Sequence, residues 1–255
     1  MSSSSRKVAV ITGAATGVGR ATAIQFAKQG FHIAVNYSRS EKEAAETVHQ
    51  IKMYGVETLM HACDISDNSA VQQMFQQIHQ HFGQINVLVN NAGLGDSETF
   101  EASDEALWQA TMDINLRAPF FLTQYALPAL RESGGNVVMV SSVSGLMGHP
   151  KGVSVYCTSK GGLNNMTRVL ALELADQVRV NAIAPGPIDT DMLSIPARDS
   201  GDESGYFDAL NNRVPMSRIG TVRETANGIL YLASDLAGYT TGAILSLDGG
   251  MAAGH

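Results

Sequence analysis

Short apolar runs alternate with amphipathic stretches along almost the whole chain. The runs fall at residues 7–12, 31–36, 56–62, 85–89, 136–140, 178–183 and 243–247. Strands that alternate with helices, and that read as continuous apolar runs, form parallel sheets covered on both faces. The pattern therefore predicts an α/β fold: a single domain, 1–255, built on a doubly wound Rossmann-type sheet.

Stretches of helical periodicity fill the gaps between the expected strands. We expect helices at residues 20–29, 40–54, 67–82, 103–131, 156–175 and 221–234. Two of these helices open on a capping-box pattern, at Ser40 with Glu43 and at Thr221 with Glu224. Residues 191–217 are polar, and we expect an irregular segment there that closes over a substrate as a lid.

Composition excludes several classes of partner. The net charge of −7 argues against nucleic acid or an anionic membrane surface as a partner. Cys63 and Cys157 show no metal-ligand spacing with each other or with His, so we expect no metal and a reducing, cytoplasmic location. The polar start of the chain does not resemble a signal peptide, and no apolar run is long enough for a membrane span.

A glycine-rich turn follows the first expected strand. Its glycines are Gly13, Gly17 and Gly19, and Thr16 and Val18 lie between them. Glycines allow the backbone to approach a pyrophosphate, and the next helix offers free N–H groups at its N-terminus. In a strand–turn–helix context this indicates a dinucleotide site, although a structural glycine turn is the alternative.

Residues at the end of the second strand indicate whether such a site prefers NAD(H) or NADP(H). An acidic residue there would bind the ribose hydroxyls and repel a 2′-phosphate. This chain has Ser38 and Arg39 instead, which favour charge-assisted binding of a 2′-phosphate. We therefore expect NADP(H) to be preferred and NAD(H) to remain possible, with a solvated Arg39 as the alternative.

Two further strand ends also suit the cofactor. Asp64 and Ile65 follow the third strand and are placed to meet the adenine. Asn91, Ala92 and Gly93 follow the fourth strand, where small residues let the backbone pass close to the cofactor. Any turn at a strand end uses such residues, so these signals depend on their context.

Tyr156 and Lys160 are four residues apart at the start of a helix. At that spacing both side chains project from one helix face. A neighbouring ammonium favours the phenolate and lowers the pKa of a tyrosine, so the phenol becomes able to act as a general acid or base. Taken alone, the pair also fits a plain surface helix turn.

Ser142 and Asn115 are candidates for the same site. Ser142 ends the fifth strand, where its hydroxyl can hydrogen-bond a substrate oxygen, although Ser141 or Ser144 can take that role if the register differs. Asn115 precedes Pro119 by four residues, so its carbonyl lacks the usual helical donor. We expect a kink there and a water that links Lys160 to solvent, with a plain proline kink as the alternative.

The ordered motifs T-G-x-x-x-G-x-G, N-N-A-G, helical Asn, strand-end Ser, Y-x-x-x-K and P-G-x-I-x-T together resemble the classical short-chain dehydrogenase/reductase family over nearly the whole chain. The resemblance implies that Tyr156 is the acid–base residue and that Lys160 lowers its pKa and holds the nicotinamide ribose. It implies that Ser142 binds the substrate oxygen and that Asn115 maintains a water relay. The residues that it places at the nicotinamide end are Pro185, Gly186, Ile188 and Thr190.

One departure from the family lies between Ser142 and Tyr156. The step is fourteen residues, one more than in most relatives, and the resemblance places the extra residue in the turn-forming run 149–152. The family also implies a homotetramer formed through the helices that carry Asn115 and Tyr156.

The expected activity is hydride transfer between a nicotinamide cofactor and a small-molecule carbonyl or secondary alcohol. Similarity leans toward a 3-oxoacyl-acyl-carrier-protein reductase that uses NADPH, although an acidic chain suits an acidic carrier protein less well. A sugar, polyol or hydroxysteroid dehydrogenase is the alternative. A protein of another class, which senses the cofactor without catalysis, also remains open because fold does not dictate function.

Overall fold

One seven-stranded parallel sheet organises the chain. The computed structural model describes residues 6–95, 98–149 and 152–254. The strands are β1 (Val8–Ile11), β2 (His32–Tyr37), β3 (Thr58–Ala62), β4 (Val87–Asn90), β5 (Asn136–Val140), β6 (Arg179–Pro185) and β7 (Ile244–Leu247). Their order across the sheet is β3-β2-β1-β4-β5-β6-β7, which confirms the predicted doubly wound fold.

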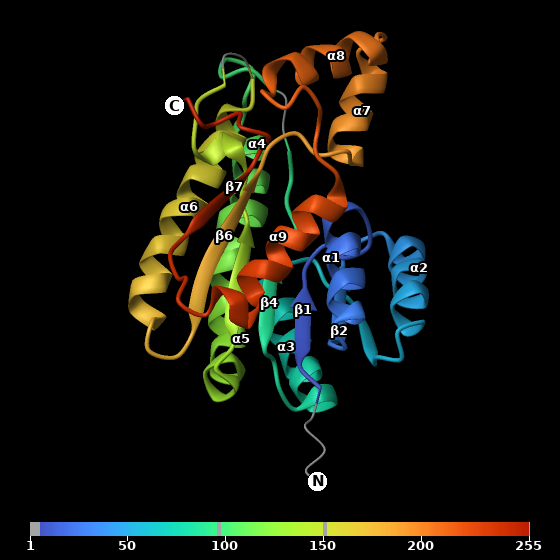
Figure 1. The fold of residues 1–255 in the computed structure, drawn as a ribbon, viewed down its shortest axis with the longest axis vertical. Coiled ribbons are helices and arrows are strands. Elements are labelled where there is room, and N and C mark those ends of the chain that lie inside the picture. The colour runs from blue at the N-terminus through green and yellow to red at the C-terminus, as the bar shows by residue number, and fades with distance from the viewer. Residues whose placement is uncertain (1–5, 96–97, 150–151, 255) are drawn as a thin grey trace.

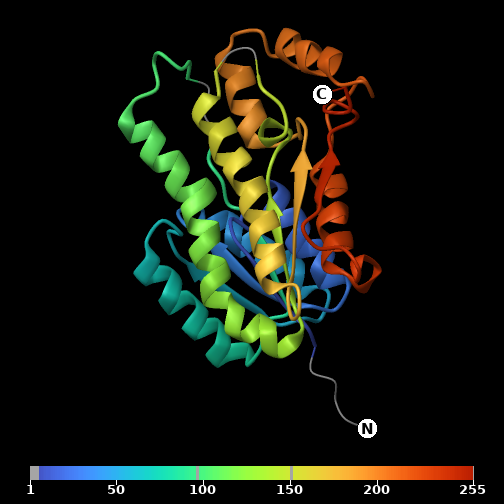
Figure 2. The ribbon, with the colours of Figure 1, turned by 90° about the vertical axis from the view of Figure 1, so that its left-hand side faces the viewer.

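Helices cover both faces of this sheet (Figure 1, Figure 2). They are α1 (Gly17–Lys28), α2 (Glu41–Lys52), α3 (Asn68–Phe82), α4 (Glu105–Met112), α5 (Ala118–Ser133), α6 (Ser154–Leu174), α7 (Asp191–Asp199), α8 (Glu203–Arg213) and α9 (Val222–Ala233). One buried cluster packs α1, α2 and α9 on the sheet, and a second packs α3, α5 and α6 on the opposite face. Two apolar layers therefore sandwich strands such as β1 and β5, whose residues are all buried.

The strand order reverses between β1 and β4. Chain order runs outward from β1 through β2 to β3, and then crosses back to β4 on the other side of β1. In open parallel sheets a ligand binds at the carboxyl ends of the strands beside this switch point. The turns that carry Gly13 and Asn91 follow β1 and β4, so the fold brings them to that place.

The long helix expected over residues 103–131 is interrupted. It is built from α4, a π-helical turn η1 (Asp113–Arg117) and α5. Pro119 has no N–H to continue the regular ladder, and a π turn accommodates the missing donor. We expected a kink at Asn115, and the structure has a π turn there that interrupts the regular helix.

The expectation of an irregular segment over residues 191–217 is wrong. This segment, which we call the lid segment, contains α7 and α8 and lies at the end of the molecule opposite the N-terminus (Figure 1). Asp202 caps α8 by accepting a hydrogen bond from the N–H of Gly205 at 2.9 Å. No residue of α8 is buried, so the helix lacks the apolar stripe that would have revealed it in the sequence.

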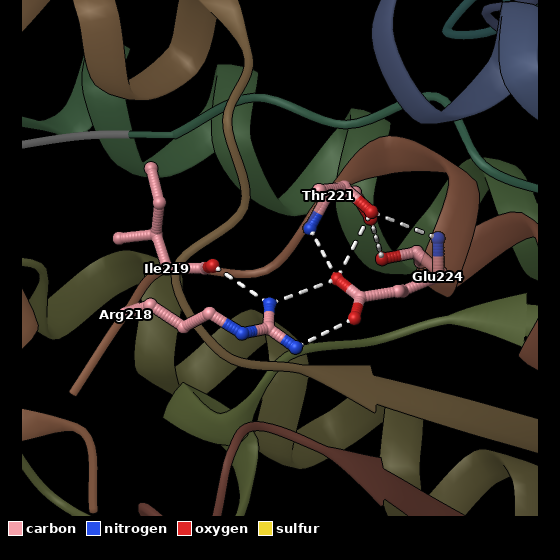
Figure 3. Close-up of polar contacts among 5 residues, drawn as sticks. Arg218, Ile219, Thr221 and Glu224 are labelled. Carbon is pink, nitrogen blue, oxygen red and sulfur yellow. Dashed lines mark hydrogen bonds and ion pairs between the residues drawn. The ribbon is translucent and has the colours of Figure 1, made fainter. Parts of the chain in front are cut away.

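One of the two predicted capping boxes is also wrong. Ser40 precedes α2, but its side chain makes no capping hydrogen bond. Thr221 and Glu224 form the complete box at the start of α9 (Figure 3). The backbone of Thr221 is extended at φ −102° and ψ 153°, which aims its hydroxyl at the Glu224 N–H, whereas Ser40 has ψ 61°.

Candidate active site

Glycines in the turn after β1 are required by backbone angle or by close packing. Gly13 and Gly17 adopt positive φ values of 60° and 53°. A Cβ on Gly19 would lie 2.2 Å from the carbonyl oxygen of Gly13. The turn is therefore bare backbone next to the N-terminus of α1, which fits the pyrophosphate of a dinucleotide.

Thr12 and Asn91 fasten the turn after β4 to the turn after β1. The Oγ1 atom of Thr12 accepts hydrogen bonds from the N–H groups of Asn91 at 2.9 Å and Ala92 at 3.0 Å. The Nδ2 atom of Asn91 donates to the carbonyl of Thr12 at 2.8 Å. The predicted cofactor residues Gly13, Asn91 and Ala92 are thus brought into one rigid group.

The end of β2 contributes a buried support and an exposed basic group. Asn36 is 3% exposed; its Oδ1 accepts from the N–H of Gly13 at 3.3 Å and its Nδ2 donates to Cys63 O at 3.0 Å. Ser38 and Arg39 are exposed beyond it. Hydrogen bonds from Ser66 hold the pKa of Asp64 below its usual range, and the charge of Arg39 adds to this effect.

Ile65, the other residue expected at the adenine, is buried in the core cluster with α3. Asn36 was not singled out from the sequence as a support of the turn. Its signal was a polar residue inside an apolar run, because an amide in a core needs partners.

Asn115 holds the loop after β4 through its side chain. Its Oδ1 accepts from the N–H of Leu94 and its Nδ2 donates to the carbonyl of Leu94, each at 2.8 Å. The same Nδ2 lies 3.1 Å from Oγ of Ser159. The π turn therefore points this amide at the loop and at α6, while the water relay expected at its carbonyl stays a prediction.

Lys160 lies next to Asn115 and Tyr156. Its Nζ donates to the carbonyl of Val140 at 2.9 Å and lies 5.6 Å from the centroid of the Tyr156 ring. Burial lowers the pKa of Lys160 to about 8. A Cβ on Gly93 would lie 3.3 Å from Oδ1 of Asn115 and 3.5 Å from Nζ of Lys160, so the loop after β4 runs directly over both groups.

The three serines after β5 have different partners. The hydroxyl of Ser141 points to the carbonyl of Lys160 at 3.4 Å. Ser142 accepts a hydrogen bond on Oγ from the N–H of Ser144 at 3.1 Å, which leaves its own O–H free to donate in another direction. The Oγ of Ser144 lies 2.9 Å from Nε2 of His149.

The segment after β6 reaches the glycine-rich turn. Thr190 is the nearest side chain to Gly17, since a Cβ there would lie 3.5 Å from its Cγ2. A Cβ on Gly186 would lie 2.9 Å from the backbone of Asp248, and Ile188 forms an isolated parallel bridge with Gly220. Pro185 ends β6, so the four residues predicted at the nicotinamide end lie along this path.

Sequence reasoning did not single out Ser159, which lies 3.1 Å from Asn115, or His149, which contacts Ser144. It also missed Arg213, a terminal nitrogen of which lies 3.2 Å from Nδ1 of His149. The insertion expected at 149–152 falls partly outside the described residues, because Pro150 and Lys151 are not among them. Within the described ranges, no three His, Cys, Asp or Glu side chains gather as a metal site. None of the described helices combines the length and the apolar character that a membrane crossing requires.

Comparisons with known proteins agree with this geometry. A family model described as "Enoyl-(Acyl carrier protein) reductase" matches residues 13–252. The chain is 35% identical over 247 residues to a 3-oxoacyl-[acyl-carrier-protein] reductase FabG of Staphylococcus epidermidis, covering 96% of this chain and 98% of the relative.

Two solved structures are also similar to the chain. A structure of levodione reductase superposes with a TM-score of 0.93 at 30% identity, covering 98% of each chain. A short-chain dehydrogenase/reductase from Serratia marcescens superposes with a TM-score of 0.89 at 31% identity, covering 96% of this chain and 98% of the other.

Proposed function

Because the chain belongs to the classical short-chain dehydrogenase/reductase family of oxidoreductases, we propose that it is an NADPH-dependent reductase of a 3-oxoacyl-type carbonyl. The observation that carries this proposal is the cluster at the carboxyl ends of β4 and β5. There Lys160 lies beside Tyr156, and the loop at 91–93 runs over Lys160 and Asn115 and contacts the glycine turn that suits a dinucleotide. We propose that all described strands and helices form one catalytic domain.

The glycine turn, the loop at 91–93 and the segment at 185–190 are the parts that would hold the cofactor. When bound, a nicotinamide dinucleotide supplies a hydride to the carbonyl carbon. Gly13 and Gly19 let the turn pack tightly on itself and on Asn91, and the N-terminus of α1 beside it would attract the pyrophosphate. Lys160 is buried next to Tyr156, where its ammonium would bind a ribose hydroxyl.

Tyr156 gives the proton in the proposed reduction. Its hydroxyl donates to the carbonyl oxygen as that oxygen gains negative charge, and the product is a secondary alcohol. The charged form of Lys160 favours the resulting phenolate, which solvent then reprotonates. Ser142 donates a second hydrogen bond to the same oxygen, because the N–H of Ser144 already occupies one of its lone pairs.

Two observations support Ser142 over its neighbours in this role. Ser141 is directed at the backbone of α6, and Ser144 is engaged with His149. Asn115 bonds Leu94 and lies 3.1 Å from Ser159, so we propose that it positions the loop after β4 and α6.

Arg39 supports the preference for NADPH. It is exposed beside Ser38 at the end of β2, and its charge acts on Asp64 across the adenosine end of the proposed site. A 2′-phosphate would take the place of solvent around the guanidinium. We expect Arg39→Ala to raise the KM for NADPH about tenfold and to leave that for NADH unchanged.

The test of the function is a rate of NADPH and NADH oxidation with a panel of carbonyls. The panel holds an acetoacetyl thioester, a diketone, a ketose, a ketosteroid and, because of the family model's description, a crotonyl thioester. We expect turnover with NADPH and the acetoacetyl thioester, and loss of turnover with retained NADPH binding in Tyr156→Phe. Equal activity of Tyr156→Phe and the wild type would contradict the acid–base role.

The proposal extends to assembly and location. A groove of about 580 Å³ lies between α4, η1, α5 and α6, and apolar side chains such as Phe120 and Val169 line it. We propose that a second copy of the chain covers this groove as part of a homotetramer. Two cysteines without a disulfide between them support a reducing compartment, the cytoplasm.

A further inference from the structure

A chain of three hydrogen bonds connects the loop after β5 to the lid segment. The N–H of Ser144 donates to Oγ of Ser142 at 3.1 Å, and Oγ of Ser144 lies 2.9 Å from Nε2 of His149. The Nδ1 atom of His149 lies 3.2 Å from a terminal nitrogen of Arg213, the last residue of α8. These bonds lead from a lid helix to the serine proposed to bind the substrate oxygen.

The partners of His149 decide its protonation state. A guanidinium has only donors, so Nδ1 must accept the hydrogen bond from Arg213 and cannot carry a proton. In a neutral imidazole the proton is then on Nε2, which donates to Oγ of Ser144. Burial and, to a smaller extent, the charge of Arg213 lower the pKa of His149, in agreement with a neutral ring.

This tautomer also fixes the Ser144 hydroxyl. Oγ of Ser144 accepts a hydrogen bond from Nε2 of His149, so its own O–H is available to donate elsewhere. Ser144 lies in the short turn η2 (Val143–Gly145), and Ser142 caps this turn by accepting a hydrogen bond from the N–H of Ser144. A shift of Ser144 would therefore move the oxygen of Ser142.

Helix α8 is held by packing against α7 and by contacts near its C-terminal end, where Oδ1 of Asn211 accepts a hydrogen bond from the N–H of Ile219 at 3.0 Å. No residue of the helix is buried, whereas Val214, which follows it, is 3% exposed and packs near Gly249. Beyond it, Arg218 binds Glu224 at the start of α9 through two hydrogen bonds of 2.7 and 3.1 Å (Figure 3). Arg213 thus lies between the exposed helix α8 and the well-packed segment that follows it. At this place a hydrogen bond to His149 affects how α8 is held.

We propose that His149 is a positioning residue that fastens lid helix α8 to the loop carrying Ser142, so that a carbonyl substrate is held between them. The proposal rests on the proposed function, because it concerns how that site grips its substrate.

Variants of the two ends of the link test this role with the acetoacetyl thioester as substrate. His149→Ala and Arg213→Ala each remove one end, and the double variant removes both. His149→Asn keeps an acceptor near the Nδ1 position, and His149→Gln keeps a donor near the Nε2 position. Arg198→Ala is the matched control, because this lid arginine is exposed and bonds within its own helix, to Ser194.

We expect His149→Ala and Arg213→Ala to raise the KM for the thioester about tenfold with an unchanged Kd for NADPH. The double variant should be no worse than either single variant, because both remove one link. His149→Asn should keep the lid contact and His149→Gln the Ser144 contact, so each should restore part of the KM. Additive effects of the two alanine variants, or equal losses in KM and cofactor affinity, would overturn the proposal.

Hydrogen exchange of the amides in α8 separates failure of this link from failure of the proposed function. His149→Ala and Arg213→Ala should speed exchange over residues 203–213, while Arg198→Ala and His149→Asn should not. If the wild type reduces no carbonyl, the proposed function fails. The hydrogen-exchange rates of α8 then test the link between His149 and Arg213 by themselves. Unchanged exchange in both alanine variants would overturn it.

Discussion

Lys160 is a buried cation with one carbonyl as its hydrogen-bond partner among the described contacts. Burial lowers the pKa of Lys160 from near 10.5 to about 8. At neutral pH Lys160 is therefore charged in both states, but the charge costs more free energy in the folded protein than in the unfolded chain. The linkage amounts to a destabilisation of about 3 kcal/mol at pH 7. Between the two pKa values the unfolded chain binds more protons, so this destabilisation diminishes as the pH rises.

Lys160→Met should therefore change how stability depends on pH. Both proteins are measured without cofactor. Between pH 7 and pH 9.5 the free energy of unfolding of the wild type should rise by about 2 kcal/mol relative to that of Lys160→Met. Urea titrations of both proteins at several pH values measure this difference. A difference that stays constant over that range would mean that Lys160 is not buried as described.

Gly19 has the least room of the glycines in the nucleotide turn. A methyl group at this position would meet the carbonyl oxygen of Gly13 at 2.2 Å, and backbone atoms cannot swing aside as a side chain can. Gly19→Ala should weaken NADPH binding about tenfold or more, measured by cofactor fluorescence. Gly55→Ala is the control: Gly55 has φ 67° but no neighbour within 4 Å, so it should lose some stability and no affinity.

At the scale of elements, two similar sequence patterns have different outcomes. Thr221 forms a complete capping box with Glu224, and hydrogen bonds from Arg218 and Thr221 lower the pKa of Glu224 to about 2. Ser40 makes no capping bond. Thr221→Ala should lower the free energy of unfolding by about 1 kcal/mol, whereas Ser40→Ala should leave it nearly unchanged. Equal melting-temperature losses in the two variants would contradict this contrast.

The elements that could be predicted are those with buried faces. Strands such as β1 and β5 are buried along their whole length, so an apolar run identified them. Helix α8 has no buried residue, so no apolar stripe reveals it, and α7 contains Pro196, a residue that argues against a helix interior. The break at Asn115 was predictable because a proline removes a donor, but the form of the break, a π turn, depends on packing.

At the scale of the whole molecule, the sheet order explains why much of the site was predictable. Loops that follow parallel strands meet at one edge, so the positions of Gly13, Asn91 and Ser142 along the chain were enough to place them together. The link between Ser144, His149 and Arg213 was not predictable, because it joins segments 64 residues apart through side chains of common types. Local patterns carry no signal for such a contact.

The surface of α5 and α6 leaves an apolar groove that a single chain does not fill. Phe120 and Val169 are each 44% exposed there, and Figure 2 shows the two helices side by side. A second copy would remove this surface from water, which favours association.

Val169→Glu should therefore lower the mass of the assembly in light scattering after gel filtration, from a tetramer toward a dimer of 27.1 kDa chains, because a charge would be buried in the contact. Met53→Glu is the matched control, since Met53 is 77% exposed at the end of α2 and outside the groove. A wild type that is already monomeric, or a Val169→Glu variant with wild-type mass, would show that this groove is not an interface between copies.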